Sequence, residues 1–149
     1  MFQKLMNTSD DFVMTLLRLV LGVVFFAHGA QKALGLFGGY GFRASLGFFT
    51  QMMHIPAPLA VLAIAAEFLG GIGLVVGFLG RVAAFGIAAN MVVAVILVHR
   101  HFGFFANWSG MQKGEGYEYH VLVLAISLAI MIRGSGALSI DRSASRELA

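Results

Sequence analysis

Apolar residues lie in long blocks along this chain, and most polar residues are confined to the stretches between these blocks. Four blocks are long enough to cross a bilayer, over residues 12–30, 59–79, 82–98 and 117–132. At about 1.5 Å per residue they extend over roughly 24–32 Å, close to a hydrocarbon thickness of about 30 Å. We therefore predict an all-α fold, an integral membrane four-helix bundle that forms a single transmembrane domain over residues 1–149.

The stretch between the first two blocks has a different pattern. Four glycines lie between residues 35 and 41 and argue against a continuous helix there. After them, large apolar side chains recur at helical spacing, at Phe42, Leu46, Phe49 and Met53. This pattern predicts a short amphipathic helix at the membrane interface, with a re-entrant segment as the alternative.

The composition agrees with a protein that folds in lipid. Apolar residues make up 59% of the chain and charged residues 11%, against about 25% charged in soluble domains. The nineteen glycines fit membrane helices that pack closely through small residues. The chain has no cysteine, which excludes thiol chemistry, and a net charge of +3 without a Lys/Arg run excludes nucleic acid as an expected partner.

The distribution of Lys and Arg indicates an orientation. Four spans place both termini on one side, together with five basic residues: Lys4, Arg81, Arg133, Arg142 and Arg146. The other side has four: Lys32, Arg43, Arg100 and Lys113. Because cytoplasmic segments carry the excess of basic residues, we predict a multi-pass protein of the bacterial inner membrane with cytoplasmic N- and C-termini.

Ionisable residues gather in one half of the predicted bundle. The first block ends at His28 and Lys32, the third ends before His99, and the fourth begins at Tyr119 and His120. Glu67 lies about 12 Å into the second block, where a carboxylate costs several kcal/mol unless it is paired or protonated. The other half of the bundle has only Arg18 within a span.

Several roles are open to these side chains. Glu67 can carry protons, ligate a metal or bond a quinone, or it can form a structural ion pair with Arg18, Lys32 or a histidine. Haem and metal ions are weaker hypotheses, because no closely spaced histidine motif is present. Arg18 and Asn90 are predicted to be structural polar residues that bond across helices.

Four motifs follow one another along the chain: LRLVLGVVFFAHGAQK (residues 17–32), EFLGGIGLVVG (67–77), GEGYEYH (114–120) and GSGALSID (134–141). In this order and on four predicted spans, they resemble the DoxX family of small bacterial membrane proteins. This resemblance implies a four-helix inner-membrane protein. Members are often labelled oxidoreductases, relatives called DoxD and DoxA form a thiosulfate:quinone oxidoreductase, and some members associate with redox or detoxification enzymes.

The resemblance leads to a hypothesis of a membrane redox subunit that acts with quinone and a protein partner. Glu67 and His28 would exchange protons, while Lys32, Tyr119 and His120 would form the quinone pocket. A non-catalytic membrane anchor or assembly partner is the alternative, and a small-molecule carrier is the second alternative. Beyond the lipid bilayer, the expected partners are a redox or detoxification protein and a further copy of the chain.

Overall fold

A computed structural model describes residues 5–147, and all of its regular elements are helical. The long helices are α2 (Phe12–Leu34), α4 (Ala57–Val76), α5 (Gly80–Leu97) and α6 (Glu118–Arg133). Within the described residues, α2, α4 and α5 have the length and hydropathy of membrane spans. Helix α6 has 16 residues and packs along α5. The prediction of an all-α membrane bundle is confirmed.

Several helix boundaries differ from the predicted ones. Helix α2 continues four residues beyond position 30, because Gln31 and Lys32 are compatible with a helix and Gly35, at φ +75°, is the first left-handed residue. Helix α4 ends at Gly77, at φ +73°, so the turn to α5 lies at residues 77–79. The predicted turn at Gly80–Arg81 is therefore the first turn of α5.

The predicted short helix between the first two spans is present. It comprises α3 (Gly41–Gly47) and a π-helical turn, η1 (Phe48–Met52). The Thr50 hydroxyl donates to the Leu46 carbonyl at 2.9 Å and stabilises this junction. Its place relative to the bilayer, at the interface or re-entrant, stays a prediction.

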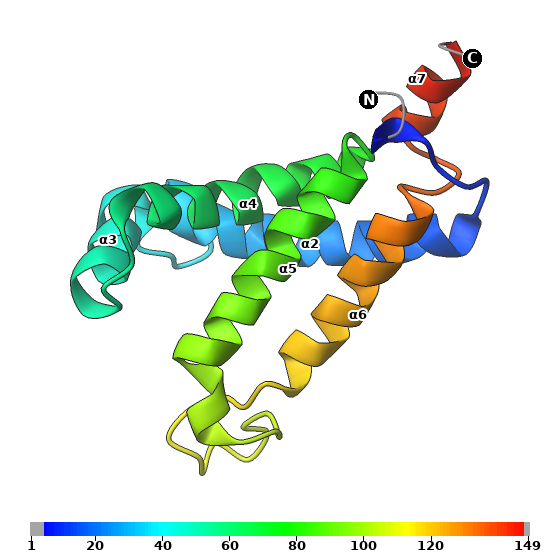
Figure 1. Cartoon of the computed structure of the whole chain (residues 1–149). Coiled ribbons are helices and arrows are strands. Elements are labelled where there is room, and N and C mark those ends of the chain that lie inside the picture. Colours follow the sequence, from blue (N-terminus) through cyan, green and yellow to red (C-terminus); the bar gives the residue numbers. More distant parts are fainter. Residues whose placement is uncertain (1–4, 148–149) are drawn as a thin grey trace.

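The long helices form two hairpins that contact each other at one end and as far as the middle of α5, where Asn90 bonds the Ala63 carbonyl of α4. The first hairpin is α2 with α4, and the second is α5 with α6. Figure 1 shows that the hairpins converge near α7 (Ile140–Glu147) and spread apart toward α3 and toward the loop after α5. A buried core joins the hairpins, and it includes Leu21, Phe25, Leu74, Ile87 and Ile130. The spread leaves an angle between the hairpins at the end opposite α7.

Glycines allow α2 and α4 to pack with their backbones in contact. A Cβ at Gly29 would collide with the backbone of Phe68, and a Cβ at Gly71 would collide with that of Phe26. A Cβ at Gly22 would lie 2.8 Å from the Val75 nitrogen. These glycines recur over the length of both helices, so the first hairpin is a closely packed unit in which backbone approach replaces side-chain interdigitation.

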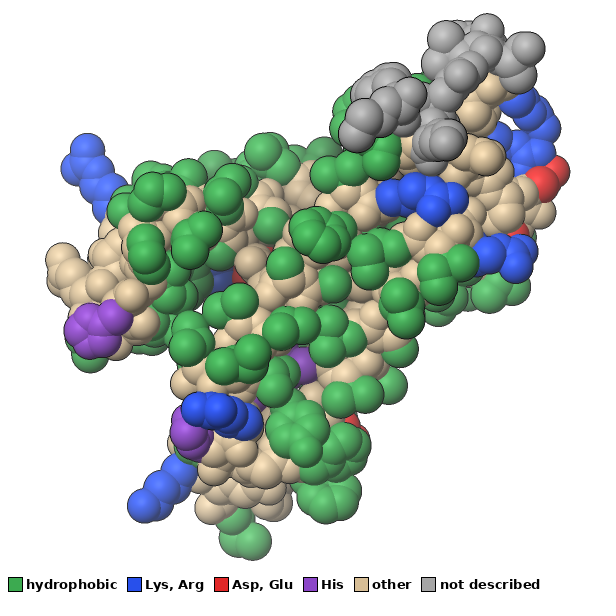
Figure 2. Space-filling model, viewed as in Figure 1, with side chains coloured by type: hydrophobic (Ala, Val, Ile, Leu, Met, Phe, Trp, Pro, Cys, Tyr) green, Lys and Arg blue, Asp and Glu red, His purple; other side chains and the backbone are tan. Residues whose placement is uncertain are grey.

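The outer surface matches a lipid environment. Many large apolar side chains are exposed on the long helices, among them Phe12, Leu62, Phe85 and Leu122, each more than 60% exposed. Figure 2 shows hydrophobic side chains over the flanks of both hairpins, with Lys and Arg gathered toward the ends. In water so much apolar surface would drive aggregation, whereas a bilayer covers it.

The Arg18 side chain is buried at the end where the hairpins converge, with 1% of its surface exposed. Its guanidinium donates to the carbonyls of Leu74 and Val75 at the end of α4, and to those of Ser135 and Leu138 after α6. The two carbonyls of α4 lie in its last turn, where the helix provides no N–H partner for them. One cation thus joins α2, the end of α4 and the segment after α6.

Asp141 makes the complementary contacts beside Arg18. It is 1% exposed, and its carboxylate accepts from the backbone N–H groups of Leu79 at 2.7 Å and Gly80 at 3.0 Å, and from the Ser135 hydroxyl at 2.5 Å. It therefore caps the N-terminus of α5 from a distant part of the chain. The sequence predicts Arg18 as the one ionisable residue within a span in this half, and Asp141, which lies outside the spans, is buried beside it.

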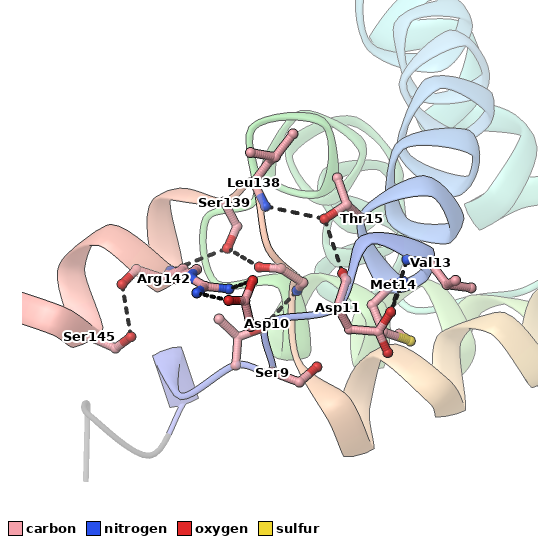
Figure 3. Close-up of polar contacts among 12 residues, drawn as sticks. Ser9, Asp10, Asp11, Val13, Met14, Thr15, Leu138, Ser139, Arg142 and Ser145 are labelled. Atoms are coloured by element: carbon pink, nitrogen blue, oxygen red, sulfur yellow. Dashed lines mark hydrogen bonds and ion pairs between the residues drawn. The ribbon is translucent and has the colours of Figure 1, made fainter.

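The segments flanking the bundle are tied together by further polar contacts, shown in Figure 3. Asp11 caps α2 through the N–H groups of Val13 and Met14, and Thr15 accepts from the Leu138 N–H. Arg142 of α7 forms an ion pair with Asp10. The hydrogen bond from Arg142 lowers the pKa of Asp10 below its ordinary value, so this contact is kept unless the solution is strongly acidic.

We predict that Gly29→Ala destabilises the protein by about 1–3 kcal/mol, because the added methyl group has to separate α2 from α4. Gly47→Ala in α3 is the matched control, since its Cβ would meet nothing within 4 Å. Equilibrium unfolding in mixed detergent micelles measures both variants. Equal stability of the two variants would contradict the close packing described for the first hairpin.

We predict that Arg18→Met costs about 3 kcal/mol or more, because several buried carbonyls and the Asp141 carboxylate lose their compensating partner. Arg100→Met is the control, because Arg100 is exposed on the loop side. The same unfolding assay compares them. An Arg18→Met protein as stable as the control would show that water reaches these carbonyls.

Candidate functional site

The angle between the hairpins contains a cleft of about 600 Å³. Residues from α2, η1, α4, α5, α6 and the loop after α5 line it. All five residues predicted for a catalytic or cofactor site are among them: His28, Lys32, Glu67, Tyr119 and His120. The cleft is thus the place where polar side chains from both hairpins meet.

An ion pair occupies the first wall of the cleft. The Lys32 ammonium lies 2.6 Å from a carboxylate oxygen of Glu67, with the two side chains 27% and 11% exposed. The close approach of α2 to α4 at Gly29 brings the two side chains within reach, since Gly29 lies directly against the Glu67 backbone. The pairing compensates the burial of the carboxylate, while the ammonium keeps two further donors for a ligand.

Two histidines form the facing wall. His120, in the first turn of α6, is 6% exposed, and its ring centroid lies 4.0 Å from that of His99. His99 belongs to η2 (His99–Phe102), and its Nδ1 donates to the Glu115 carbonyl at 2.8 Å. The Nδ1 of His120 is buried and has no hydrogen-bond partner among residues 5–147. The hydrogen-bonding capacity of this buried nitrogen is therefore not used by the described residues.

The remaining surface of the cleft is aromatic and apolar. Tyr119 is 40% exposed and meets the His120 ring edge-on, with centroids 5.6 Å apart. His28 lies one turn before Lys32 and is exposed, with its ring 6.4 Å from that of Phe25. The apolar lining consists of Phe25, Phe48, Phe49, Met53 and Met91. Such a lining with a few convergent polar groups is typical of sites for small organic ligands.

A second cavity of about 520 Å³ lies behind the first, between the end of α2 and α3. The two cavities share Lys32, Phe48 and Phe49 as a common wall. Because Phe48 and Phe49 belong to η1, this π-helical turn borders both cavities.

The other polar residues of interest lie elsewhere. Arg18 is at the opposite end of the bundle, and Asn90 donates from α5 to the Ala63 carbonyl of α4 at 2.8 Å. His54 and His101 are exposed and do not line the cleft. Across the described part of the chain, no three His, Cys, Asp or Glu side chains are grouped as a metal ion would require.

Sequence reasoning left two contributors out of the site. His99 and Glu115 line the cleft, but they come from the loop side of α5 and α6, where polar residues are ordinarily solvated. The position of His99 directly after the third predicted span is only a weak indication that it belongs to the site. The contact between the Glu115 carbonyl and His99 depends on the path of a 15-residue loop, which hydropathy does not predict.

Comparison with known proteins identifies the family of this chain. The DoxX family model matches residues 13–100, which are more than half of the chain. The chain belongs to the DoxX family. The matched segment includes α2, α4 and α5, and with them the Lys32–Glu67 pair and His99.

Two relatives extend the similarity to nearly the whole chain. A protein of Bacillus subtilis (strain 168) named "Putative oxidoreductase CatD" is 29% identical over 136 residues, which are 91% of this chain and 90% of that protein. "Inner membrane protein YqjF" of Escherichia coli (strain K12) is 28% identical over 137 residues, with 92% and 95% covered. No solved structure matches the chain. The DoxX-family chain is a multi-pass inner-membrane protein.

We predict that Lys32→Met costs about 1–3 kcal/mol, because it leaves the Glu67 carboxylate without its cation, and the partial exposure of Lys32 reduces the loss. The double variant Lys32→Met/Glu67→Leu recovers most of this loss. A double-mutant cycle in the unfolding assay measures the coupling, and Lys113→Met in the exposed loop is the control. Strictly additive losses would contradict a direct ion pair.

Proposed function

We propose that this DoxX-family protein is a subunit of a membrane redox system that binds a quinone head group in the cleft between its hairpins. The observation that carries the proposal is the convergence of Lys32, Glu67, Tyr119 and His120 on one cleft of about 600 Å³. A ring of quinone size needs apolar walls and a few hydrogen-bonding groups, and the cleft offers both.

The chemistry of the lining assigns a role to each side chain. Lys32, with donors left after its bond to Glu67, hydrogen-bonds one quinone oxygen, and the His120 side chain, which lines the cleft, bonds the other. Tyr119 lies against the ring. Glu67 and His28 exchange the protons that accompany quinone reduction, in which two electrons and two protons convert the quinone to a quinol.

The electrons come from a protein partner in this proposal. The chain has no cysteine, and its described residues do not group three metal ligands, so a partner with its own redox cofactor supplies them. The name of the Bacillus subtilis relative supports an oxidoreductase assignment. With cytoplasmic termini, as the distribution of basic residues predicts, the cleft lies in the outer half of the bilayer.

A non-catalytic anchor is the second candidate, and one observation favours it. The Lys32–Glu67 pair at 2.6 Å already compensates the buried carboxylate, as a purely structural pair would. In that case the cleft is filled by lipid, and the polar groups fix the register of α2 against α4. A carrier role has no comparable observation in its favour.

We predict that the protein in lipid nanodiscs binds a short-chain quinone analogue such as decylubiquinone, and that Glu67→Gln and His120→Phe each weaken the affinity about tenfold or more. A tenfold loss corresponds to about 1.4 kcal/mol, the order of one hydrogen bond to a charged group. Isothermal titration calorimetry measures the affinity.

Glu118→Gln and His101→Phe are the matched controls, because neither Glu118 nor His101 lines the cleft, and a glutamine oxygen at position 118 still accepts the 2.9 Å bond from the Ala106 N–H. The controls keep the wild-type affinity. If the wild-type protein binds no quinone analogue, the redox proposal fails and the anchor stands. If cleft and control variants lose affinity equally, the binding site is elsewhere.

A further inference from the structure

The cavity between the end of α2 and α3 has no part in the head-group contacts proposed above. Its wall is mostly apolar, with aromatic or aliphatic side chains at Tyr40, Ala44, Phe48 and Phe49. Gln31 and Lys32 also line it, but the Gln31 amide donates to the Phe37 carbonyl at 3.1 Å. The Lys32 ammonium is bonded to Glu67. An apolar ligand, or the apolar part of a larger one, therefore suits this cavity.

The second cavity adjoins the cleft along the π-helical turn η1. Phe48 and Phe49 are consecutive residues of this turn, and both line both cavities, with ring centroids 6.1 Å apart and planes tilted at 55°. The Met53 N–H donates to the Phe48 carbonyl at 3.2 Å, the five-residue spacing of a π-helix. Turns of this kind are rare and occur frequently at functional sites. This one lies where a single ligand would contact both cavities.

The two cavities are accessible to one flexible chain. Neither is enclosed, and Phe48 at their common border is 55% exposed. A chain can therefore cross from the cleft to the second cavity over this ring. An apolar cavity of about 150 Å³ holds benzene, so about 520 Å³ has room for on the order of fifteen carbon atoms, or about three isoprene units.

The benefit of such a chain is positional. Lipid tails are as apolar as the wall of the cavity, so a hydrocarbon chain gains little affinity when it leaves the bilayer for the cavity. A chain held across η1 instead restricts the direction in which an attached ring enters the cleft toward Lys32 and Tyr119, and this restriction lowers the entropy that binding costs. A lipid chain without a ring has no second point of attachment in the cleft.

We propose that the second cavity binds the first isoprene units of a prenylated quinone whose head group lies in the cleft, with the tail crossing Phe48 and Phe49. This inference rests on the proposed function. It narrows the substrate class from quinones in general to membrane-soluble quinones with a prenyl tail. The rest of a longer tail leaves the cavity past Tyr40, which is 89% exposed.

Photo-labelling in lipid nanodiscs tests where the tail lies. The probe is a ubiquinone analogue with a farnesyl tail that carries a diazirine on its second isoprene unit. The control probe is farnesol with the same diazirine and no quinone ring. After irradiation, mass spectrometry identifies the labelled peptides. We expect the quinone probe to label the segment 38–49 and decylubiquinone to compete with this labelling, whereas the farnesol probe labels the lipid-facing sides of the long helices.

A variant that fills the second cavity is expected to lose most of this labelling. Ala44→Trp adds a large side chain to the cavity wall. Arg43→Trp is the matched control, because it places the same side chain at the neighbouring position of α3, which lines neither cavity. Calorimetric titration with a tail-less dimethoxy-methyl-benzoquinone measures the cleft alone. Unchanged affinity for this head group shows that each variant is folded with an intact cleft.

The outcomes separate the tail site from the proposed function. If the quinone probe labels only lipid-facing positions while the tail-less quinone binds, the proposed function stands and the tail site is overturned. Equal labelling of the segment 38–49 by the farnesol probe, or labelling in Ala44→Trp that matches the control variant, also overturns the tail site. A wild-type protein that binds neither quinone removes the proposed function and this inference with it.

Discussion

The Arg18 guanidinium bonds carbonyl groups at the end of α4 and in the segment after α6, and the arrangement of the hairpins depends on this contact. Backbone groups left unpaired away from water cost several kcal/mol each in hydrocarbon, so a single buried cation that bonds several of them fixes the chain there. Asp141 does the same for the N–H groups that begin α5. Because the hairpins are joined at this end, they are free to diverge at the other, and the cleft follows from that divergence.

The two walls of the cleft are rigid for different reasons. In the first hairpin, glycines bring the backbones of α2 and α4 into contact, and this contact sets the distance across which Lys32 and Glu67 pair. In the second wall, His120 is fixed by the start of α6 and by its contact with the tilted ring of His99. A ligand between the walls meets side chains whose positions are set by separate hairpins, so a change in the angle between the hairpins changes the site without disturbing either wall.

The blocks of apolar residues were sufficient to predict the three helices of span length, α2, α4 and α5, because the hydrocarbon thickness sets the length of a membrane helix. A crossing by the 16-residue α6 stays a prediction. The gathering of His28, Glu67 and His120 in one half was also predictable, since residue depth follows from helical rise. The role of Asp141 was not, because in sequence it lies in a polar stretch that reads as solvent-exposed. The α4–α5 turn lies at residues 77–79 because Gly77 and Leu79 adopt left-handed conformations. The sequence does not fix this position, because the glycine at position 80 indicates a turn there equally well. No local sequence pattern predicts the angle between the hairpins.

The two polar clusters of the bundle differ in how fully they are satisfied, and this difference supports the proposal that the cleft binds a ligand. At the converging end, the Arg18 nitrogens and both Asp141 oxygens have partners within the chain, so nothing remains for a ligand. In the cleft, Lys32 has one partner for three donors, and the buried Nδ1 of His120 has none among the described residues. Burying polar groups costs free energy in both clusters, but only in the first do hydrogen bonds within the chain offset this cost. A bundle that served only as an anchor would gain stability by replacing the second cluster with apolar residues, whereas a binding site needs its hydrogen-bonding capacity left open.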